Sequence, residues 1–222
     1  MRPLTPLEAR VLGVLVEKQH TVPDTYPLSV NSLVAGCNQK TAREPVIDAS
    51  EAEVLTALDG LRSLSLVFEG SSGRVVRFEH NLGRVLRVPA QSVALLTLLM
   101  LRGPQTSSEL RLRCERLHRF ADISSAEGFL DELAEREPAL VVKLPRAPGA
   151  REPRWAHLLC GEVVLQEQPL APGVDADDAS VSAGELAALK REQARLADEL
   201  AALRALVHRI AGELGIEGNQ EP

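Results

Sequence analysis

The sequence predicts a mainly helical α+β protein in which one structural unit occurs twice and is followed by a single long helix. The stretch 50–82 reads as a capped amphipathic helix and two strands joined by a short polar turn, and the stretch 124–159 repeats this plan. The hairpin motif Phe78-x-His80-x-Leu82 returns as Trp155-x-His157-x-Leu159. Residues 182–215 carry apolar positions at alternating steps of three and four, which is the pattern of a coiled-coil helix.

The first unit is predicted to contain three helices and a hairpin. The first helix starts at Thr5, which can cap the free amides, with a proline at the first helical position and Glu8 reaching back. A shorter helix follows over 29–37, and the third begins at Ser50 with Glu53 as its capping partner. Two strand-like runs around a glycine-containing turn complete a hairpin. This order is that of a winged-helix domain, predicted for residues 1–83.

The second unit repeats this order over residues 84–165. Its first helix has an apolar stripe at helical spacing and stops at Gly103-Pro104. Thr106 and Glu109 predict the cap of the second helix. The third helix is expected to begin at Ser124, by its match to Ser50, and is followed by two strands around a loop rich in proline and glycine. A second winged-helix domain is therefore predicted.

The C-terminal part divides into a linker and a helix. Residues 166–181 are rich in Pro, Ala and Asp without an apolar period, which predicts a flexible linker. The helix over 182–215 has charge pairs of opposite sign beside its seam, as a parallel two-stranded coil prefers, so a homodimer is expected. The alternative is a helix that folds back on its own domains. The predicted seam consists of Leu186, Leu189, Gln193, Leu196, Leu200, Leu203, Val207, Ile210 and Leu214.

Composition and charge narrow the class of protein. The chain has 222 residues, of which 45% are hydrophobic and 25% charged, as in a globular protein of one to three small domains. Residues 1–165 hold 20 basic and 20 acidic side chains, so the tail supplies the whole net charge of −6. A neutral body does not by itself indicate nucleic-acid binding. Three cysteines, far apart in sequence, predict neither a disulfide framework nor a zinc site. No cofactor motif is present.

No segment of the sequence has the length of a membrane span. The apolar run near the N-terminus is too short for a signal peptide, and nothing approaches about 18 consecutive apolar residues. A cytoplasmic protein without membrane contact is the expectation.

Several long motifs make the chain resemble the YceH-like family of uncharacterised bacterial proteins. They are LTPLEARVLGVLVEK (4–18), TVPDTYPLSVNSL (21–33), CNQKTAREPV (37–46), RGPQTSSEL (102–110), FAD (120–122) and LPRAPGAREPRWAHLLCGE (144–162). The resemblance covers most of residues 4–162 and implies tandem winged-helix domains. It implies no established activity.

Duplex DNA is one candidate ligand of the first unit. A winged helix usually lays its third helix in the major groove and its wing along the backbone. The third helix has a nearly balanced charge, but basic residues precede it and lie on the predicted wing. These residues, expected to neutralise phosphates, are Lys40, Arg43, Arg74 and Arg77. The alternative is an ordinary solvated surface of mixed charge.

The second unit has a different charge distribution. Its third helix is strongly acidic, which disfavours insertion into a DNA groove and suits a protein partner. Its basic side chains lie on or after the second helix and on the wing, and suit a protein partner or a second subunit as well as DNA. They are Arg111, Arg113, Arg116, Arg119, Arg146, Arg151 and Arg154.

Catalysis has the least support in the sequence. The five histidines show no metal-ligand spacing, and no nucleophile or phosphate-binding motif is present. His80 and His157 occupy equivalent places, which favours a structural hydrogen bond at the hairpin exit, and the cysteines are expected in the core. The sequence therefore predicts a non-enzymatic, DNA-associated regulator that acts as a dimer. The alternative is a winged-helix adaptor that holds proteins together without binding DNA.

Overall fold

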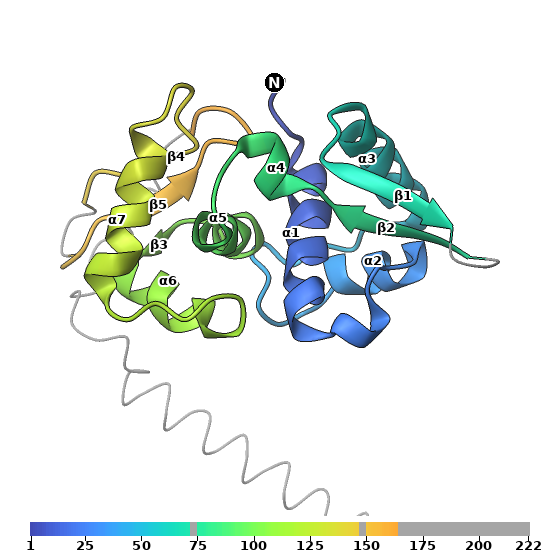
Figure 1. Ribbon diagram of the computed structural model, residues 1–222, viewed down its shortest axis with the longest axis horizontal. Coiled ribbons are helices and arrows are strands. Elements are labelled where there is room, and N and C mark those ends of the chain that lie inside the picture. The colour runs from blue at the N-terminus through green and yellow to red at the C-terminus, as the bar shows by residue number, and fades with distance from the viewer. Residues whose placement is uncertain (72–74, 147–149, 164–222) are drawn as a thin grey trace, which may run out of the picture. The chain divides into compact units, whose positions relative to one another are not determined.

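The computed structural model describes residues 1–71, 75–146 and 150–163. Within this part the chain forms seven α-helices and two small antiparallel sheets, so the predicted α+β fold is confirmed at this level (Figure 1). None of the described helices is long and apolar enough to cross a membrane. The predicted linker, 166–181, and the predicted coiled-coil helix, 182–215, lie outside the described residues.

The first half runs helix, helix, helix, strand, strand, as the sequence pattern predicts. The capping boxes expected for the first and third helices are both present: Thr5 accepts from the amide of Glu8, and Ser50 from that of Glu53. A short 3₁₀ turn follows the first helix. The elements are α1 (Pro6–Thr21), η1 (Pro23–Thr25), α2 (Val30–Cys37), α3 (Glu51–Ser63), β1 (Val67–Ser71) and β2 (Val76–His80).

The second half repeats this order with one additional helix ahead of it. The predicted capping box of Thr106 and Glu109 is present. The elements are α4 (Leu82–Leu86), α5 (Ala90–Arg102), β3 (Gln105–Thr106), α6 (Ser107–Arg113), η2 (Cys114–Arg116), α7 (Ile123–Ala134), β4 (Val141–Lys143) and β5 (Arg154–His157). Helix α4 spans the predicted boundary between residues 1–83 and 84–165, where no helix is predicted, and its Leu82 is fully buried.

The two hairpins are anchored in the same way, which supports the internal repeat. Phe78 of β2 exchanges backbone hydrogen bonds with Leu28, at 2.8 and 3.1 Å, just before α2. Trp155 of β5 pairs with Gln105 of β3, just before α6. The sheet order β3-β5-β4 therefore places Trp155 in the central strand, as Phe78 is central between Leu28 and Glu69 of β1.

The third helix of the second half begins earlier than predicted. Asp122 is its N-cap and accepts from the amide of Ser125 at 2.7 Å, so Ser124 lies inside the first turn. The match of Ser124 to Ser50 is therefore wrong by two positions. Asp122 is the last residue of the FAD motif, and an aspartate is as good a cap as a serine.

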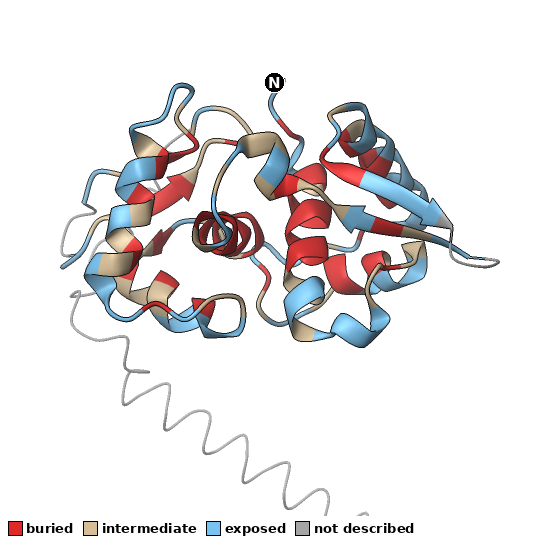
Figure 2. Ribbon diagram, viewed as in Figure 1, coloured by how far each residue is buried: buried red, intermediate tan, exposed pale blue. Residues whose placement is uncertain are grey.

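Helices α1 and α5 form the centre of the described body. Every residue of α5 from Ser92 to Leu101 is buried, and so is every residue of α1 from Glu8 to Val16 (Figure 2). The two helices approach closely at Gly13, where an added Cβ would lie 2.9 Å from a methyl group of Leu101. The buried apolar side chains of both halves form one continuous cluster.

Backbone hydrogen bonds also join the halves. The amide of Leu4, before α1, donates to Leu159, after β5, at 2.8 Å. The amide of Glu44, in the loop between α2 and α3, donates to Leu101 of α5 at 2.8 Å. The two sequence repeats are thus parts of one packed body.

Candidate interaction surfaces

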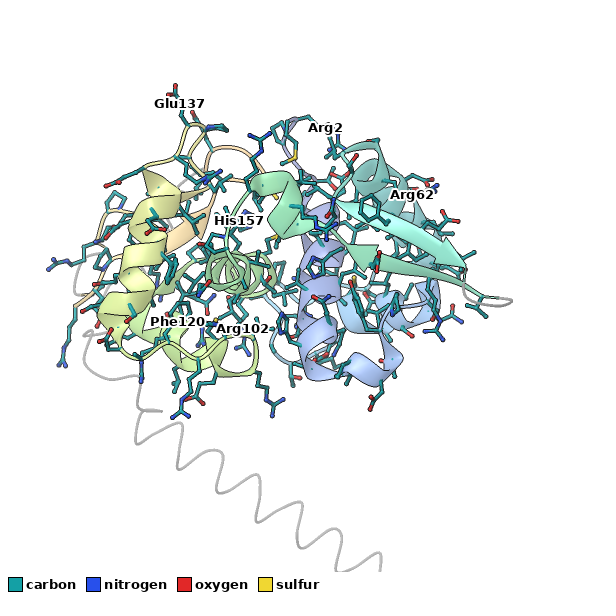
Figure 3. The ribbon with its side chains drawn as sticks, viewed as in Figure 1. Arg2, Arg62, Arg102, Phe120, Glu137 and His157 are labelled. Atoms are coloured by element: carbon teal, nitrogen blue, oxygen red, sulfur yellow. The ribbon has the colours of Figure 1, made fainter. Side chains whose placement is uncertain are left out.

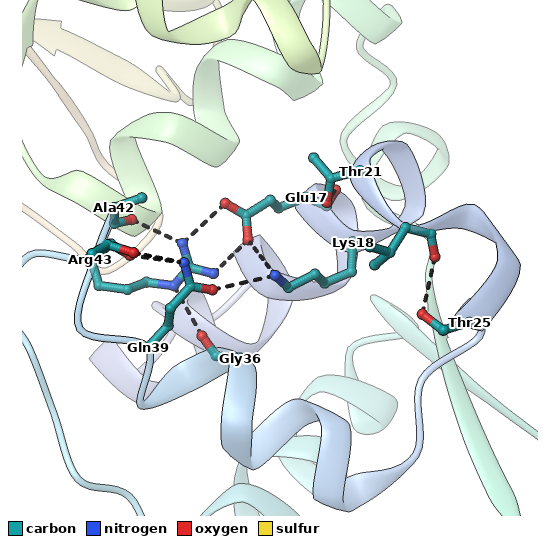
Figure 4. Close-up of polar contacts among 10 residues, drawn as sticks. Glu17, Lys18, Thr21, Thr25, Gly36, Gln39, Ala42 and Arg43 are labelled. Atoms are coloured by element: carbon teal, nitrogen blue, oxygen red, sulfur yellow. Dashed lines mark hydrogen bonds and ion pairs between the residues drawn. The ribbon is translucent and has the colours of Figure 1, made fainter. Parts of the chain in front are cut away.

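Arg43, a predicted phosphate contact, is buried and committed to structural bonds. Its side chain is 0% exposed, and its terminal nitrogens donate to the two carboxylate oxygens of Glu17 at 3.0 and 2.5 Å. Its Nε donates to the carbonyl of Gly36 at 3.0 Å, and Nη1 also reaches the carbonyl of Ala42 (Figure 4). The expectation that Arg43 contacts DNA is therefore corrected. This side chain fixes the loop after α2 to helix α1.

The other predicted members of this group are placed differently from one another. Arg77 is half-buried and donates to the carbonyls of Pro27 at 2.7 Å and Thr25 at 3.2 Å, so it holds the turn before α2 against β2. Lys40 is exposed and makes no hydrogen bond or ion pair with the described residues. Arg74 lies outside the described residues. Among the described residues, Lys40 is therefore the one predicted phosphate contact of the first half that is exposed and without a partner.

The outer face of α3 is acidic. Glu51, Glu53 and Asp59 are exposed along it. Its basic residue, Arg62, is engaged by Asp59 at 3.3 Å and by Glu69 of β1 at 2.9 Å (Figure 3). Negative charge is left over on the face that a winged helix would offer to a DNA groove.

Helix α7 carries a stronger acidic surface. Asp131 and Glu132 are exposed on it and Glu135 is exposed at its C-cap, and none of the three forms an ion pair within the described residues. Arg136 follows the helix but points its guanidinium to the carbonyl of Leu86, at 2.8 Å. These carboxylates, with Glu51 and Asp59 of α3, are called the acidic helix faces below.

The predicted basic residues of the second half fall into two groups. Arg111 is half-buried and donates to the carbonyl of Ala121 at 3.3 Å, and Arg113 contacts Gln105 at 2.9 Å and Glu109 at 3.2 Å. The remaining arginines are exposed side chains on η2, after it, and on the β4–β5 hairpin. They are Arg116, Arg119, Arg146, Arg151 and Arg154.

The two equivalent histidines differ in their hydrogen bonding. The Nε2 of His80 lies 2.7 Å from the amide oxygen of Gln19, which is the structural hydrogen bond that the sequence predicts. The Nδ1 of His157 is buried and has no hydrogen-bond partner among the described residues. Burial lowers the pKa of each ring to about 4, so both are neutral near pH 7.

Two of the three cysteines lie in positions that disfavour reaction of their thiols. Cys37 and Cys114 are fully buried, and burial raises the pKa of the first thiol to about 11 and of the second to about 12. Cys160 is half-buried, and its thiol faces the carbonyl of Thr5 at 3.8 Å. Within the described part of the chain, no three His, Cys, Asp or Glu side chains gather as a metal site would require.

Arg10 is a polar residue that the sequence analysis did not single out. It is 4% exposed, within the apolar centre of α1, and donates to the carbonyls of Cys37 at 3.1 Å and Pro45 at 2.7 Å. The sequence signal for its burial is its place between Ala9 and Val11, in the most apolar part of the helix. The predicted dimer seam, from Leu186 to Leu214, lies outside the described residues.

Comparison with known proteins shows which family the chain belongs to. A family model described as "Protein of unknown function, DUF480" matches residues 4–150. A UPF0502 protein from Burkholderia multivorans is 68% identical over 219 residues, which cover 99% of this chain and 92% of the relative. The chain belongs to the DUF480 family. A second UPF0502 protein, from Burkholderia thailandensis, is 68% identical over 220 residues, covering 99% and 93% of the two chains.

Membership of the DUF480 family confirms the resemblance to uncharacterised bacterial proteins of the YceH type. The names of the relatives state no activity, substrate or partner. Any function of this DUF480 chain is therefore argued from its own surfaces.

Proposed function

We propose that this protein is a non-enzymatic adaptor that binds protein partners through the acidic faces of two winged-helix modules. The single observation that carries the proposal is the charge of the two third helices. Both α3 and α7 present exposed carboxylates. The one basic residue of α3, Arg62, pairs with Asp59 and with Glu69 of β1, which leaves Glu51 without an ion pair among the described residues, and Arg136, after α7, donates to a backbone carbonyl. A basic surface of a partner protein complements such faces.

The element order of each half supports the winged-helix interpretation. Three helices precede a hairpin, and the second hairpin strand pairs back with the residues before the second helix. In a DNA-binding winged helix the third helix enters the major groove, close to phosphates on both sides. Carboxylates at that place oppose the phosphate charge, and they favour a cationic protein surface instead.

Most of the described basic residues predicted to bind DNA in the first half are engaged in structural bonds. Of the four basic residues predicted there, Arg43 is buried, Arg77 holds backbone carbonyls and only Lys40 is an exposed cation among those described. One lysine releases few counterions and gives little affinity.

The proposal is tested by two measurements on the full chain. A photo-crosslinking residue placed at Glu132 on α7 is expected to give a protein adduct in cells, and one placed at Lys40 is not. Reversing charge with Asp131→Lys and Glu135→Lys is expected to abolish that adduct while the fold, checked by circular dichroism, is kept. A fluorescent duplex should show no saturable binding at low salt. Saturable duplex binding without any adduct at position 132 would overturn the adaptor.

Duplex DNA remains a second candidate ligand because of the exposed arginines of the second half. Arg116, Arg119, Arg146 and Arg154 make no ion pair within the described residues. If DNA binds there, Arg116→Ala with Arg119→Ala should weaken it about ten-fold or more and reduce the salt slope by roughly two. Lys40→Ala, on the first half, is the matched control and should change neither value.

The tail pattern supports a dimeric form of the adaptor. The heptad seam of residues 182–215 predicts a two-stranded coil that brings two bodies together. Light scattering of the full chain against a version ending at Val181 tests this prediction. A dimer and a monomer are expected, respectively; equal masses per particle would remove the coil from the proposal.

A further inference from the structure

A cavity of about 430 Å³ lies where the two halves of the described body meet. It is lined by the first half of α1, the loop between α2 and α3, Glu53 of α3, the end of α5 and the residues around the end of β5. Its volume is in the range of cavities that hold small molecules. The surfaces assigned to the adaptor do not use it.

Arg10 is a basic residue of the cavity lining. Its terminal nitrogens are bound to two carbonyls, but its Nε is buried and has no hydrogen-bond partner among the described residues. No carboxylate forms an ion pair with Arg10 in the part of the chain that the structure describes. A buried guanidinium keeps its positive charge, and an unpaired N–H and an unbalanced charge both cost free energy. Arg10 therefore favours an anionic acceptor.

His157 lines the same cavity and is also left without a partner. Its buried Nδ1 makes no hydrogen bond with the described residues, whereas His80 in the equivalent place bonds Gln19. Figure 3 shows His157 above α5 in this view. In its Nδ1-protonated tautomer the ring is a second hydrogen-bond donor for an anionic acceptor.

The rest of the lining defines the remainder of a ligand. Leu7, Ile47 and Met100 give apolar walls. Glu44, Asp48 and Glu53 line the cavity as exposed side chains, so they lie at its mouth. The cavity is thus positive and hydrogen-bond donating in its interior, apolar on its walls and negative at its opening.

We propose that this cavity binds a small zwitterion with an apolar body, of the class of the apolar α-amino acids. Its carboxylate accepts from Arg10 and His157, its apolar side chain packs on Leu7, Ile47 and Met100, and its ammonium group faces Glu44 and Asp48. Because the cavity joins the two halves, occupancy stabilises their packing by binding the folded state alone. This inference does not rest on the adaptor proposal.

Cys160 provides a reporter of occupancy. It lines the cavity and is half-buried, whereas Cys37 and Cys114 are 0% exposed. Alkylation of the folded full chain by N-ethylmaleimide, followed by mass spectrometry, therefore reads Cys160. Millimolar L-leucine is expected to slow this reaction several-fold. Leucinamide, which lacks the carboxylate, and N-acetyl-leucine, which lacks the ammonium group, are expected to leave the rate unchanged.

Variants test the two ends of the site. Glu44→Gln with Asp48→Asn, both at exposed positions, should reduce protection by leucine several-fold and leave the fold intact. Arg10→Lys, which keeps the charge, should abolish protection; Glu132→Gln on α7 is the distant control and should protect as the parent does. The proposal is overturned if no apolar amino acid slows alkylation, or if leucinamide and N-acetyl-leucine protect as well as leucine.

Discussion

The fate of Arg43 shows what a sequence pattern leaves open at the scale of one residue. A basic residue in a polar stretch between two helices reads as exposed, but this one is buried against Glu17, 26 positions earlier. A local sequence pattern does not predict a long-range ion pair, because each partner has the sequence surroundings of a surface residue in its own helix or loop. The same holds for Arg10, whose partners are backbone carbonyls that the sequence cannot reveal.

Removing the Arg43 side chain is expected to destabilise the folded chain. Arg43→Ala leaves the carboxylate of Glu17 half-buried, with Lys18 at 3.6 Å as its remaining cation, and removes the bonds to Gly36 and Ala42. The loss should be about 3–5 kcal/mol, as for other broken buried ion pairs. Urea unfolding measures it. Lys40→Ala, three positions away and exposed, is the control and should change stability by less than about 0.5 kcal/mol. Equal effects would contradict the burial of Arg43.

The buried histidines predict a loss of stability in mild acid. Burial, aided at His80 by the charge of His20, lowers the folded pKa of His80 and of His157 from 6.5 to about 4. Between these values the unfolded chain binds more protons than the folded one, so stability present above pH 6.5 falls as the pH drops toward 4. Since both side chains are only partly buried, the total loss should be roughly 2–4 kcal/mol.

Urea unfolding near pH 7 and near pH 4.5 measures this loss. The double variant His80→Gln with His157→Gln should show a clearly shallower dependence on pH in that interval. A dependence unchanged by the double variant would assign the acid sensitivity to other groups. The carboxylates of Glu8 and Asp122 are separable, because their hydrogen bonds to Arg2 and Ser125 lower their pKa values and move their contribution to more acidic pH.

At the scale of elements, the capping motifs predict helix starts well. The boxes at Thr5, Ser50 and Thr106 are found as predicted, because capping depends on residues within one turn of each other. The prediction for the start of α7 is wrong because it depends on the similarity of Ser124 to Ser50, whereas the capping side chain is that of Asp122. The apolar stripe of α5 does not predict its burial on all sides, although a helix without a polar face is the signal of a central one.

The N-cap of α7 can be tested by substituting Asp122 and Ser124 in turn, with Ser50, the N-cap of α3, as the reference. Ser50→Ala should lower the stability of the chain by about 1 kcal/mol, as the loss of an N-cap usually does. Asp122→Ala should shift the urea midpoint by a comparable amount, because it removes the bonds to the amide and hydroxyl of Ser125. Ser124→Ala should leave the midpoint nearly unchanged. A larger effect of Ser124→Ala than of Asp122→Ala would restore the start predicted from the sequence.

For the whole molecule, the packing of the two repeats could not be derived from the sequence. The repeat predicts two domains, 1–83 and 84–165, but a short connection is compatible with several arrangements. In the structure, α1 of the first repeat and α5 of the second pack against each other, and the segments before α1 and after β5 pair. Close packing at Gly13 and backbone bonds across the joint depend on tertiary fit, which no periodicity encodes.

The shared core predicts that both halves unfold together. Leu58 of α3 is 1% exposed in the first half, whereas the chain's single tryptophan, Trp155, is buried in the second. If unfolding is one cooperative step, Leu58→Ala should lower the stability reported by Trp155 fluorescence by about 2–5 kcal/mol, the usual cost of such a cavity. Leu55→Ala, on the same helix but 40% exposed, is the matched control and should cost far less. A Trp155 transition that Leu58→Ala leaves unmoved would mean that the repeats unfold as independent domains despite their common core.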